Sequence, residues 1–385
     1  MKIQPKYDDI SDIDKIRSVY HEIKSNSKHK EKFVRFELFL LSNFITILTI
    51  LRNKKYHQEN YNIFLISDPK YRVIMSENLS DKIINHLISK HILFPVLENK
   101  LIPTNIATRK NKGTKAGIYY MKKYINKLKE NYNNFYILKC DVSKYFYSID
   151  HELLIKQLEQ EFNDEDILNI VKEIIESTNQ PYINENIINK VSAEQIKVLS
   201  SISNKKEKQD KIISLKKVPL YTTGKGLPIG NMSSQILAIY YLNKLDHFIK
   251  EKLKVKYYIR YMDDFILIHH DKEYLKYCLS EIKQELAKLK LQLNNKTTIS
   301  EIHQGVNFLG YRFLLKEKKL IIKINKRTKQ KLIRKMHNKS LKEKELLLKK
   351  YNGNLKNAHS KGLIYQLKFN QIKKKRQLAS NHNDI

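Results

Sequence analysis

Residues 255–268 read VKYYIRYMDDFILI, two hydrophobic runs on either side of a paired-acid bend. The runs are rich in β-branched and aromatic residues, so the stretch predicts a β-hairpin with Asp263 and Asp264 at its turn. Taken alone, the two acids are more often explained by an ordinary hairpin turn, because Asp is a common turn former. The elements on either side of the hairpin therefore have to decide the fold.

Those flanking elements alternate in type. Residues 135–141 form a short β-type run that ends in an acid, and a breaker-rich loop at 226–230 precedes a predicted helix from about 233 to 250. After the hairpin, apolar residues follow helical spacing over 275–289, and 306–313 returns to β character. The order β, α, β, β, α, β is the ferredoxin-like, split βαβ arrangement, so an α+β fold is predicted.

This arrangement has a chemical consequence. The end of the first strand and the hairpin turn can lie side by side, which would bring Asp141 next to Asp263 and Asp264. Three crowded carboxylates repel one another unless a cation is present, so the pattern predicts Mg²⁺. Two such ions about 3.5–4 Å apart can activate an attacking oxygen and stabilise a leaving one, which is the chemistry of nucleotidyl transfer.

Composition points to a polyanionic partner. The 385 residues include 73 Lys and Arg against 40 Asp and Glu, a net charge of +33, and 41% are hydrophobic. The apolar content excludes a wholly disordered chain, and the length predicts two or three folded units. The charge favours nucleic acid as the partner, and the alternative is a compositional bias, because the chain is rich in Lys, Asn and Ile together.

The charge is unevenly distributed. Residues 321–385 contain 19 Lys and Arg against 3 Asp and Glu. Apolar spacing at Leu332, Ile333 and Met336, and again at 346–347, predicts basic amphipathic helices there. Residues 179–217 are polar and Lys-rich, which predicts an insertion or a long loop.

Other features exclude several classes of protein. Cys140 and Cys278 are too few for a disulfide scaffold and lack metal-ligand spacing, so a reducing compartment is expected. The N-terminus lacks the pattern of a secretory signal, and the most apolar stretch, residues 38–51, is too short to span a bilayer. We expect a cytoplasmic protein without a membrane partner. The glycine loop at 224–230 is neither GxGxxG nor a P-loop, which disfavours those nucleotide sites.

Four segments of the sequence resemble the successive palm motifs of reverse transcriptases. They are KCDVSKYFYSIDH at 139–151, GLPIGNMSSQ at 226–235, YIRYMDD at 258–264 and NFLGY at 307–311. Segments 66–74, 80–82 and 107–116 resemble the fingers motifs of bacterial reverse transcriptases, and 351–360 resembles their thumb signature. The resemblance extends from about residue 61 to residue 363 and implies a right-hand polymerase with helical fingers (1–134), a ferredoxin-like palm (135–313, with the polar insertion near 179–217) and a basic helical thumb (314–385).

Within bacteria the pattern is most similar to the reverse transcriptases of diversity-generating retroelements and to defence-associated, unknown-group reverse transcriptases. Most relatives have Gln where this chain has Ile229, a position that contacts the nascent base pair, so the resemblance implies relaxed fidelity. The Val-Thr-Gly segment of retron enzymes is missing, and there is no maturase-like extension.

The resemblance assigns roles to individual residues. Asp141 and Asp263 would hold two Mg²⁺ ions, or Mn²⁺ in their place, with Asp264 completing the catalytic and metal-binding cluster. Phe146 matches the aromatic gate that clashes with a ribose 2′-hydroxyl, and the alternative is a plain core aromatic. The remaining candidates for nucleotide binding are Lys70, Arg72, Lys82, Arg109, Ile229, Gln235 and Lys296. The candidates for template and primer contact are Gly226, Pro228, Gly230, Tyr261, Met262, Phe308, Leu309 and Gly310.

The implied activity is RNA-directed DNA synthesis, in which a primer 3′-hydroxyl attacks a dNTP, in a bacterial retroelement or an anti-phage defence system. The implied partners are a structured noncoding RNA template, a DNA or RNA primer, and an accessory protein or a second copy of the chain. We expect no RNase H or endonuclease domain after the thumb. Three alternatives remain: untemplated or protein-primed DNA synthesis in defence, a catalytically idle RNA-binding polymerase-like protein, and RNA-templated RNA synthesis, against which Phe146 argues. The motifs leave open the native RNA, the primer, the oligomeric state and the choice between diversification and defence.

Overall fold

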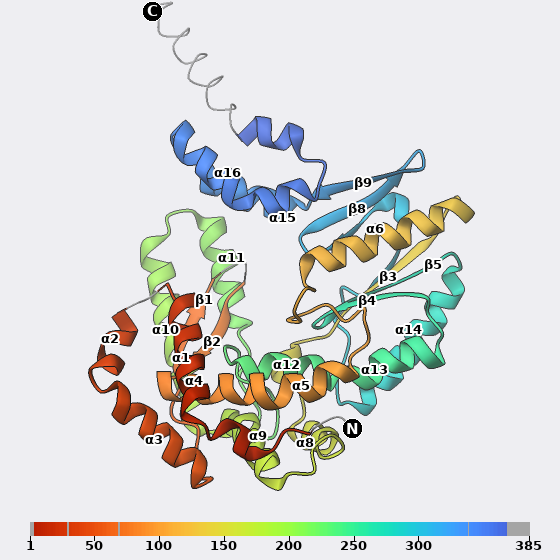
Figure 1. Ribbon diagram of the computed structural model, residues 1–385. Coiled ribbons are helices and arrows are strands. Elements are labelled where there is room, and N and C mark those ends of the chain that lie inside the picture. The colour runs from red at the N-terminus through yellow and green to blue at the C-terminus, as the bar shows by residue number, and fades with distance from the viewer. Residues whose placement is uncertain (1–3, 29–30, 68–69, 338, 368–385) are drawn as a thin grey trace, which may run out of the picture. The chain divides into compact units, whose positions relative to one another are not determined.

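The computed structural model describes residues 4–28, 31–67, 70–337 and 339–367 (Figure 1). The chain divides into two compact units. Unit 1 comprises Met1–Arg109, Val142–Lys252 and Glu281–Asn294, and unit 2 comprises Lys110–Asp141, Leu253–Ser280 and Asn295–Ile385. The three motif aspartates thus belong to unit 2, whereas Phe146 and the glycine loop belong to unit 1.

The central sheet of unit 2 has four antiparallel strands. They are β3 (Tyr136–Asp141), β4 (Tyr257–Tyr261), β5 (Asp264–His269) and β6 (Thr298–Glu301). Their order across the sheet is β4-β5-β3-β6, which is the strand order of a ferredoxin-like sheet. The predicted α+β class is confirmed, but the fourth strand is β6 and not residues 306–313. Thr298–Glu301 is short and mostly polar, so it carries no hydrophobic strand signal.

Residues 306–313 form part of a second sheet in unit 2. This sheet consists of β7 (Val306–Phe308), β8 (Tyr311–Lys316) and β9 (Lys319–Ile324), paired in that order. A two-residue turn at Leu309 and Gly310 separates β7 from β8, with φ values of 50° and 85°. Positive φ at both positions is what a tight two-residue hairpin turn requires, so the expected single run is a hairpin.

Several helices pack with these sheets in the part of unit 2 that the structure describes. They are α6 (Thr114–Asn131), α14 (Lys272–Lys288), which runs from unit 2 into unit 1, α15 (Lys326–Met336) and α16 (Leu341–Lys356). The prediction of basic helices after residue 321 is confirmed as far as residue 356, and residues 368–385 lie outside the described residues. Leu332 and Met336 are buried as the spacing implies, but Ile333 and Leu346 are exposed. The core-facing positions of α16 are Leu348 and Leu355 instead.

Unit 1 is mainly helical and contains one two-stranded sheet. The sheet pairs β1 (Asn62–Ile66) with β2 (Arg72–Ser76) in antiparallel register. Its α-helices are α1 (Ile13–Asn26), α2 (Glu31–Leu38), α3 (Leu40–Arg52), α4 (Leu79–Ile88), α5 (Phe94–Leu97), α7 (Tyr145–Ser148), α8 (His151–Glu159), α9 (Glu165–Glu176), α10 (Pro181–Ser201), α11 (Lys205–Lys216), α12 (Met232–Tyr241) and α13 (Asn243–His247).

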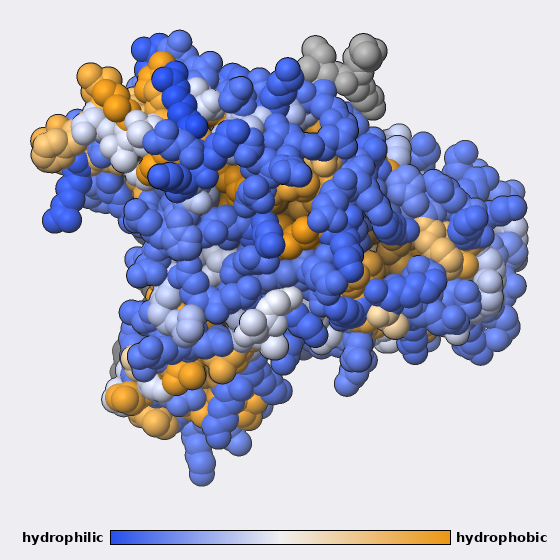
Figure 2. Space-filling view, turned by 90° about the horizontal axis from the view of Figure 1, so that it is seen from below, coloured by the Kyte–Doolittle hydropathy of each residue, from blue (hydrophilic) through white to orange (hydrophobic). Residues whose placement is uncertain are grey.

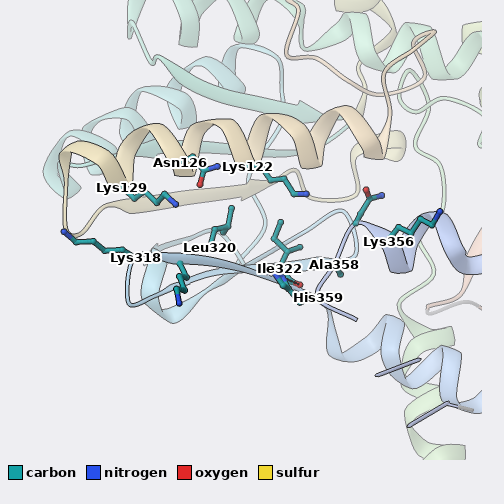
Figure 3. Close-up of a pocket in the computed structure, with 11 residues that line it drawn as sticks. Lys122, Asn126, Lys129, Lys318, Leu320, Ile322, Lys356, Ala358 and His359 are labelled. Atoms are coloured by element: carbon teal, nitrogen blue, oxygen red, sulfur yellow. Dashed lines mark hydrogen bonds between the residues drawn. The ribbon is translucent and has the colours of Figure 1, made fainter. Parts of the chain in front are cut away.

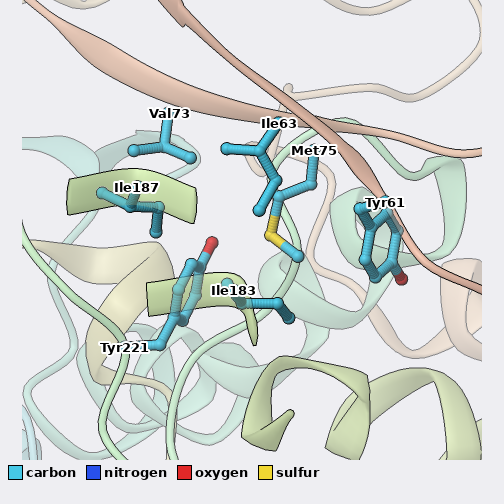
Figure 4. Packing of buried hydrophobic residues seen from close by; sticks show 7 residues of the cluster. All are labelled: Tyr61, Ile63, Val73, Met75, Ile183, Ile187 and Tyr221. Atoms are coloured by element: carbon cyan, nitrogen blue, oxygen red, sulfur yellow. The ribbon is translucent and has the colours of Figure 1, made fainter. Parts of the chain in front are cut away.

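The expected insertion at 179–217 is not a long loop, because it forms α10 and α11. Pro181 suits the first turn of α10, where its missing N–H is no loss. Ile183 and Ile187, one turn apart, pack with Ile63, Val73 and other buried residues of the β1–β2 sheet (Figure 4). The rest of α10 is largely polar and exposed, so its helical face is too narrow to stand out in the sequence.

The helix predicted near 233–250 is divided. α12 begins at Met232 and ends at Tyr241, and α13 follows after Leu242. Ser233 and Ser234 are buried inside α12 and do not cap it. Ser233 Oγ instead donates a hydrogen bond to Asn85 Oδ1 on α4, so this hydroxyl makes a tertiary contact.

The surface is mostly hydrophilic on the face seen in Figure 2, with apolar side chains gathered in separate patches. Exposed apolar side chains on or between α2 and α3 include Val34, Leu38, Phe39 and Leu41. Among the described helices, none is long and apolar enough to cross a membrane alone, and α2 and α3 satisfy that test only as a pair bent by 82°.

The packing of α10 gives a matched test of the fold. Ile187 is fully buried, whereas its neighbour Ile188 is 50% exposed. We expect Ile187→Ala to lower the free energy of unfolding, measured by urea denaturation, by about 2–5 kcal/mol, because it leaves a cavity under the sheet. Ile188→Ala should change it by less than about 0.5 kcal/mol. Equal losses in the two variants would contradict the packing of α10 on this sheet.

Candidate active site

Asp141 and Asp264 face each other across two neighbouring strands. In the antiparallel pairing of β3 with β5, Asp141 is the register partner of Asp264, and on the other side of β5 Tyr261 of β4 pairs with Asp264. Directly opposed residues of an antiparallel pair lie on the same face, with Cβ atoms about 4.5–5.5 Å apart. Asp263 is next to Asp264 in the turn. The structure therefore brings the three carboxylates together where β3 ends and β5 begins.

The turn that carries Asp263 is strained. Met262 has φ of 56°, in the left-handed region that a non-glycine residue adopts only at a cost of about 1–3 kcal/mol. Arg260 lies beneath it, fully buried, and its Nη1 donates a 2.9 Å hydrogen bond to the Met262 carbonyl. A buried arginine thus supports the turn, a role that the sequence did not reveal although Arg260 stands inside the motif.

Lys139 is a second residue that the sequence analysis missed. It lies two positions before Asp141 and therefore on the same face of β3. Its Nζ is 3.2 Å from Asp264 Oδ2 and donates a 2.7 Å hydrogen bond to the carbonyl of Asn307. Lys139 thereby joins the carboxylate site to β7, the first strand of the hairpin that contains Phe308, Leu309 and Gly310.

Asp264 has an unusual electrostatic setting. Burial is the largest cause that raises its pKa, to about 7; Lys139 opposes the rise, and Asp141 and Asp263 add to it. Its Oδ1 is buried without a hydrogen-bond partner among the described residues. A carboxylate held in this way gains from a proton or from a cation, so the site fits the expected divalent ion.

The described side chains alone do not make a complete metal site. No group of three His, Cys, Asp or Glu side chains among them is placed to hold an ion. This is compatible with Mg²⁺, which is usually bound by one or two carboxylates together with water and substrate phosphates. Asp141, Asp263 and Asp264 are the residues that would hold it, and their metal role stays a prediction.

The glycine loop of unit 1 is bound tightly to the segment that contains Phe146. Leu227 N donates to Phe146 O, and Gly226 N donates to Ile149 O, both at 2.7 Å. The His151 imidazole and the Thr178 hydroxyl also contact the Gly226 carbonyl, at 2.6 and 3.1 Å. Gly226 has φ of 95°, and a Cβ there would lie 2.6 Å from the Tyr221 ring, so only glycine fits.

The other end of this loop is fixed to β2. Met75 N donates a 2.8 Å hydrogen bond to Ile229 O, and a Cβ on Gly230 would lie 2.2 Å from the Met75 carbonyl oxygen. Phe146, Ile229 and β2 are therefore connected within unit 1 by one continuous backbone network. Phe146 itself is half-buried and packs edge-to-face with Tyr145, and its gate role stays a prediction.

The remaining candidates lie in varied surroundings. Pro228 is buried, and Gln235 is exposed in the first turn of α12. Lys70, Arg72 and Lys82 are exposed in unit 1, as is Lys296 in unit 2. These placements leave their predicted contacts to nucleotide or template untested.

Arg109 differs from the other basic candidates because its guanidinium is engaged within the protein. It contacts Glu98 Oε1 at 3.2 Å and donates to the carbonyls of Ile102 and Asn105 at 2.8 and 3.0 Å. In this structure Arg109 fastens the loop before α6, and its predicted grip on phosphate stays a prediction.

The contact between Gly230 and Met75 can be tested against a matched glycine. Gly230→Ala should lower the free energy of unfolding by about 2–4 kcal/mol, because the new Cβ must displace backbone in addition to adopting positive φ. Gly224 also has positive φ, 76°, but nothing lies within 4 Å of the added Cβ, so Gly224→Ala should lose about 1 kcal/mol. Thermal or urea unfolding measures both. A loss no greater for Gly230→Ala than for Gly224→Ala would contradict the close approach to β2.

Comparison with known proteins gives a family match. Residues 54–313, more than half of the chain, match the model of the family described as "Reverse transcriptase (RNA-dependent DNA polymerase)". Comparison with curated proteins gave no match.

Among solved structures, apo telomerase from Candida tropicalis, truncated from its C-terminal domain, is 16% identical at a TM-score of 0.45 and covers 74% of this chain and 60% of that one. Telomerase from Candida albicans with a TWJ fragment of telomeric RNA is 15% identical at a TM-score of 0.43, over 79% and 55%. This chain thus spans less than two thirds of either structure. The family match, together with the ferredoxin-like sheet and its opposed aspartates, shows that the chain belongs to the reverse transcriptase family of RNA-dependent DNA polymerases.

Proposed function

We propose that this chain extends a primer 3′-hydroxyl with dNTPs on an RNA template, and that Asp141, Asp263 and Asp264 are its catalytic residues. The observation that carries the proposal is the register that sets Asp141 opposite Asp264, next to the turn with Asp263, in a member of this family. Divalent cations bound there, two Mg²⁺ ions or Mn²⁺ in their place, would supply positive charge to the attacking and leaving oxygens.

The chain's own residues have distinct parts in this proposal. Asp141, Asp263 and Asp264 present oxygen ligands at one edge of the sheet. Lys139 holds the Asp264 carboxylate and ties it to β7, so that the hairpin with Leu309 and Gly310 is fixed relative to the carboxylates. In a primer-grip role, this hairpin would hold the primer end against the reacting phosphate.

The finer assignments rest on the sequence. The Gly-Leu-Pro-Ile-Gly-Asn form of the loop supports a place in a bacterial diversity-generating retroelement or in a defence system. Ile229 supports relaxed fidelity. A structured noncoding RNA, a cytoplasmic setting and an accessory protein or second copy belong to the same proposal. The alternative is untemplated or protein-primed DNA synthesis, and the experiment below distinguishes it from templated synthesis.

The direct test is primer extension with purified protein, Mg²⁺ and dNTPs, with and without a primed RNA template. Template-dependent DNA is expected, and Asp263→Ala/Asp264→Ala should lose at least about 100-fold in rate, because the charges that stabilise the transition state are removed. Asp210→Ala, an exposed acid on α11, is the control and should retain activity. Product of equal yield without template would overturn the templated reading in favour of untemplated synthesis. Full activity in the double variant would overturn the site.

The gate role of Phe146 gives a separate prediction. Phe146→Ala should raise incorporation of ribonucleotides relative to deoxyribonucleotides by about tenfold or more, because the clash with the 2′-hydroxyl is removed. Phe146→Tyr keeps the ring and should keep the discrimination. Single-nucleotide incorporation with dNTP and NTP measures both. An unchanged ratio in an active Phe146→Ala enzyme would show that Phe146 is not the gate.

A further inference from the structure

Unit 2 contains a basic hollow that the proposed chemistry does not use. It has a volume of about 650 Å³ and lies between α6, β9 and the segment that follows α16 (Figure 3). The cationic and imidazole side chains that line it are Lys122, Lys129, Lys318, Lys319, Lys356 and His359. These residues are called the basic groove below.

The lysines of the basic groove are not neutralised by the protein. No Asp or Glu is among the lining residues, and none of the five lysines forms an ion pair with another described residue. Gathering five ammonium groups around one hollow costs electrostatic free energy that an anionic ligand would recover. The pattern therefore points to a polyanion.

The basic groove is preformed. His359 N donates a 2.7 Å hydrogen bond to Ile322 O, and Ile322 N donates a 3.0 Å hydrogen bond to His359 Nδ1, so the segment after α16 is fastened to β9. On the opposite wall, α6 packs on β9. Lys122 and Lys129 are two helical turns apart, which sets them on one face about 10 Å from each other.

The topology places much of the basic groove away from the aspartates. Lys129 is near the end of α6 that leads into the start of β3, whereas Asp141 is at the other end of β3, about 17 Å further along the strand. Likewise, Lys318 lies in the turn between β8 and β9, a full strand length from the Leu309–Gly310 turn that adjoins Asn307. Phosphates at the basic groove are therefore not those of the reacting nucleotide.

We propose that the basic groove binds the phosphate backbone of RNA at a distance from the carboxylate site, in the part of the RNA that is not being copied. The proposal rests on the proposed function only in taking RNA as the template. Lys122 and Lys129, about 10 Å apart on one face of α6, can contact separate phosphates of one strand. The described residues that line the groove include no aromatic platform for base stacking, so recognition is through the backbone, and Asn126 and His359 offer polar groups for the ribose 2′-hydroxyl.

The test compares two triple variants with the same loss of charge. Lys122→Gln/Lys129→Gln/Lys319→Gln removes cations of the basic groove, and Lys123→Gln/Lys127→Gln/Lys316→Gln removes exposed lysines of the same region that do not line it. Fluorescence anisotropy measures affinity for a 40-nucleotide RNA, for DNA of the same sequence and for a 10-nucleotide RNA template with its primer, at several salt concentrations. Primer extension is measured on the short template.

The groove variant should bind the 40-nucleotide RNA at least tenfold more weakly than the wild type. Its slope of log affinity against log salt should be smaller in magnitude by about 2, because three phosphate contacts are lost and each contributes about 0.7. Its extension of the short template should stay within about twofold of the wild type, and the control variant should bind the long RNA like the wild type.

Several outcomes would overturn the proposal. Equal losses in the two variants would mean that net charge alone acts, and no loss in the groove variant would mean that the hollow does not bind RNA. Equally tight binding of the DNA, with the same loss, would overturn the assignment to RNA. If the wild type extends no primer at all while the groove variant still loses RNA affinity, the proposed function fails and the RNA-binding groove stands.

Discussion

The pairing of β3 with β5 is the constraint on which the rest of the structure depends. Because the side-chain period of a strand is two, only this register sets Asp141 and Asp264 opposite each other on one face, and a slip of one residue would turn Asp141 to the other face. The same pairing makes β3 a central strand, because β6 pairs with residues 136–139 on its other side, while Asp141 at its end keeps Asp264 as its register partner.

Carboxylates held close together repel one another, which costs free energy, and neighbouring residues offset part of this cost. The burial that raises the pKa of Asp264 to about 7 also leaves one of its oxygens without a partner among the described residues. Lys139 compensates part of this charge, and the fully buried Arg260 supports the strained turn at Met262. Strain and unmatched charge that concentrate at one edge of a sheet are typical of a functional site, where a ligand completes the balance.

The sequence predicted the order of elements and the meeting of the aspartates, because hydrophobic periodicity and the hairpin motif are local signals. It missed β6, whose four residues are mostly polar, and it did not predict the helices α10 and α11, because only a narrow apolar stripe of α10 is buried. Lys139 and Arg260 act through contacts that exist only in the folded chain. Arg109 is a residue that the motif did indicate, but the motif did not predict its contacts within the protein. Its guanidinium binds Glu98 and the carbonyls of Ile102 and Asn105.

We propose that the β3–β5 register builds a cation site from Asp141 and Asp264. Mn²⁺ binding tests this site most directly, because Mn²⁺ can replace Mg²⁺ and is visible by electron paramagnetic resonance. In the presence of a dNTP, the wild type should bind Mn²⁺ at least tenfold more tightly than Asp141→Asn and Asp264→Asn, with Asp210→Asn unchanged. Wild-type Mn²⁺ affinity in both site variants would contradict the account, because it would place the cation elsewhere.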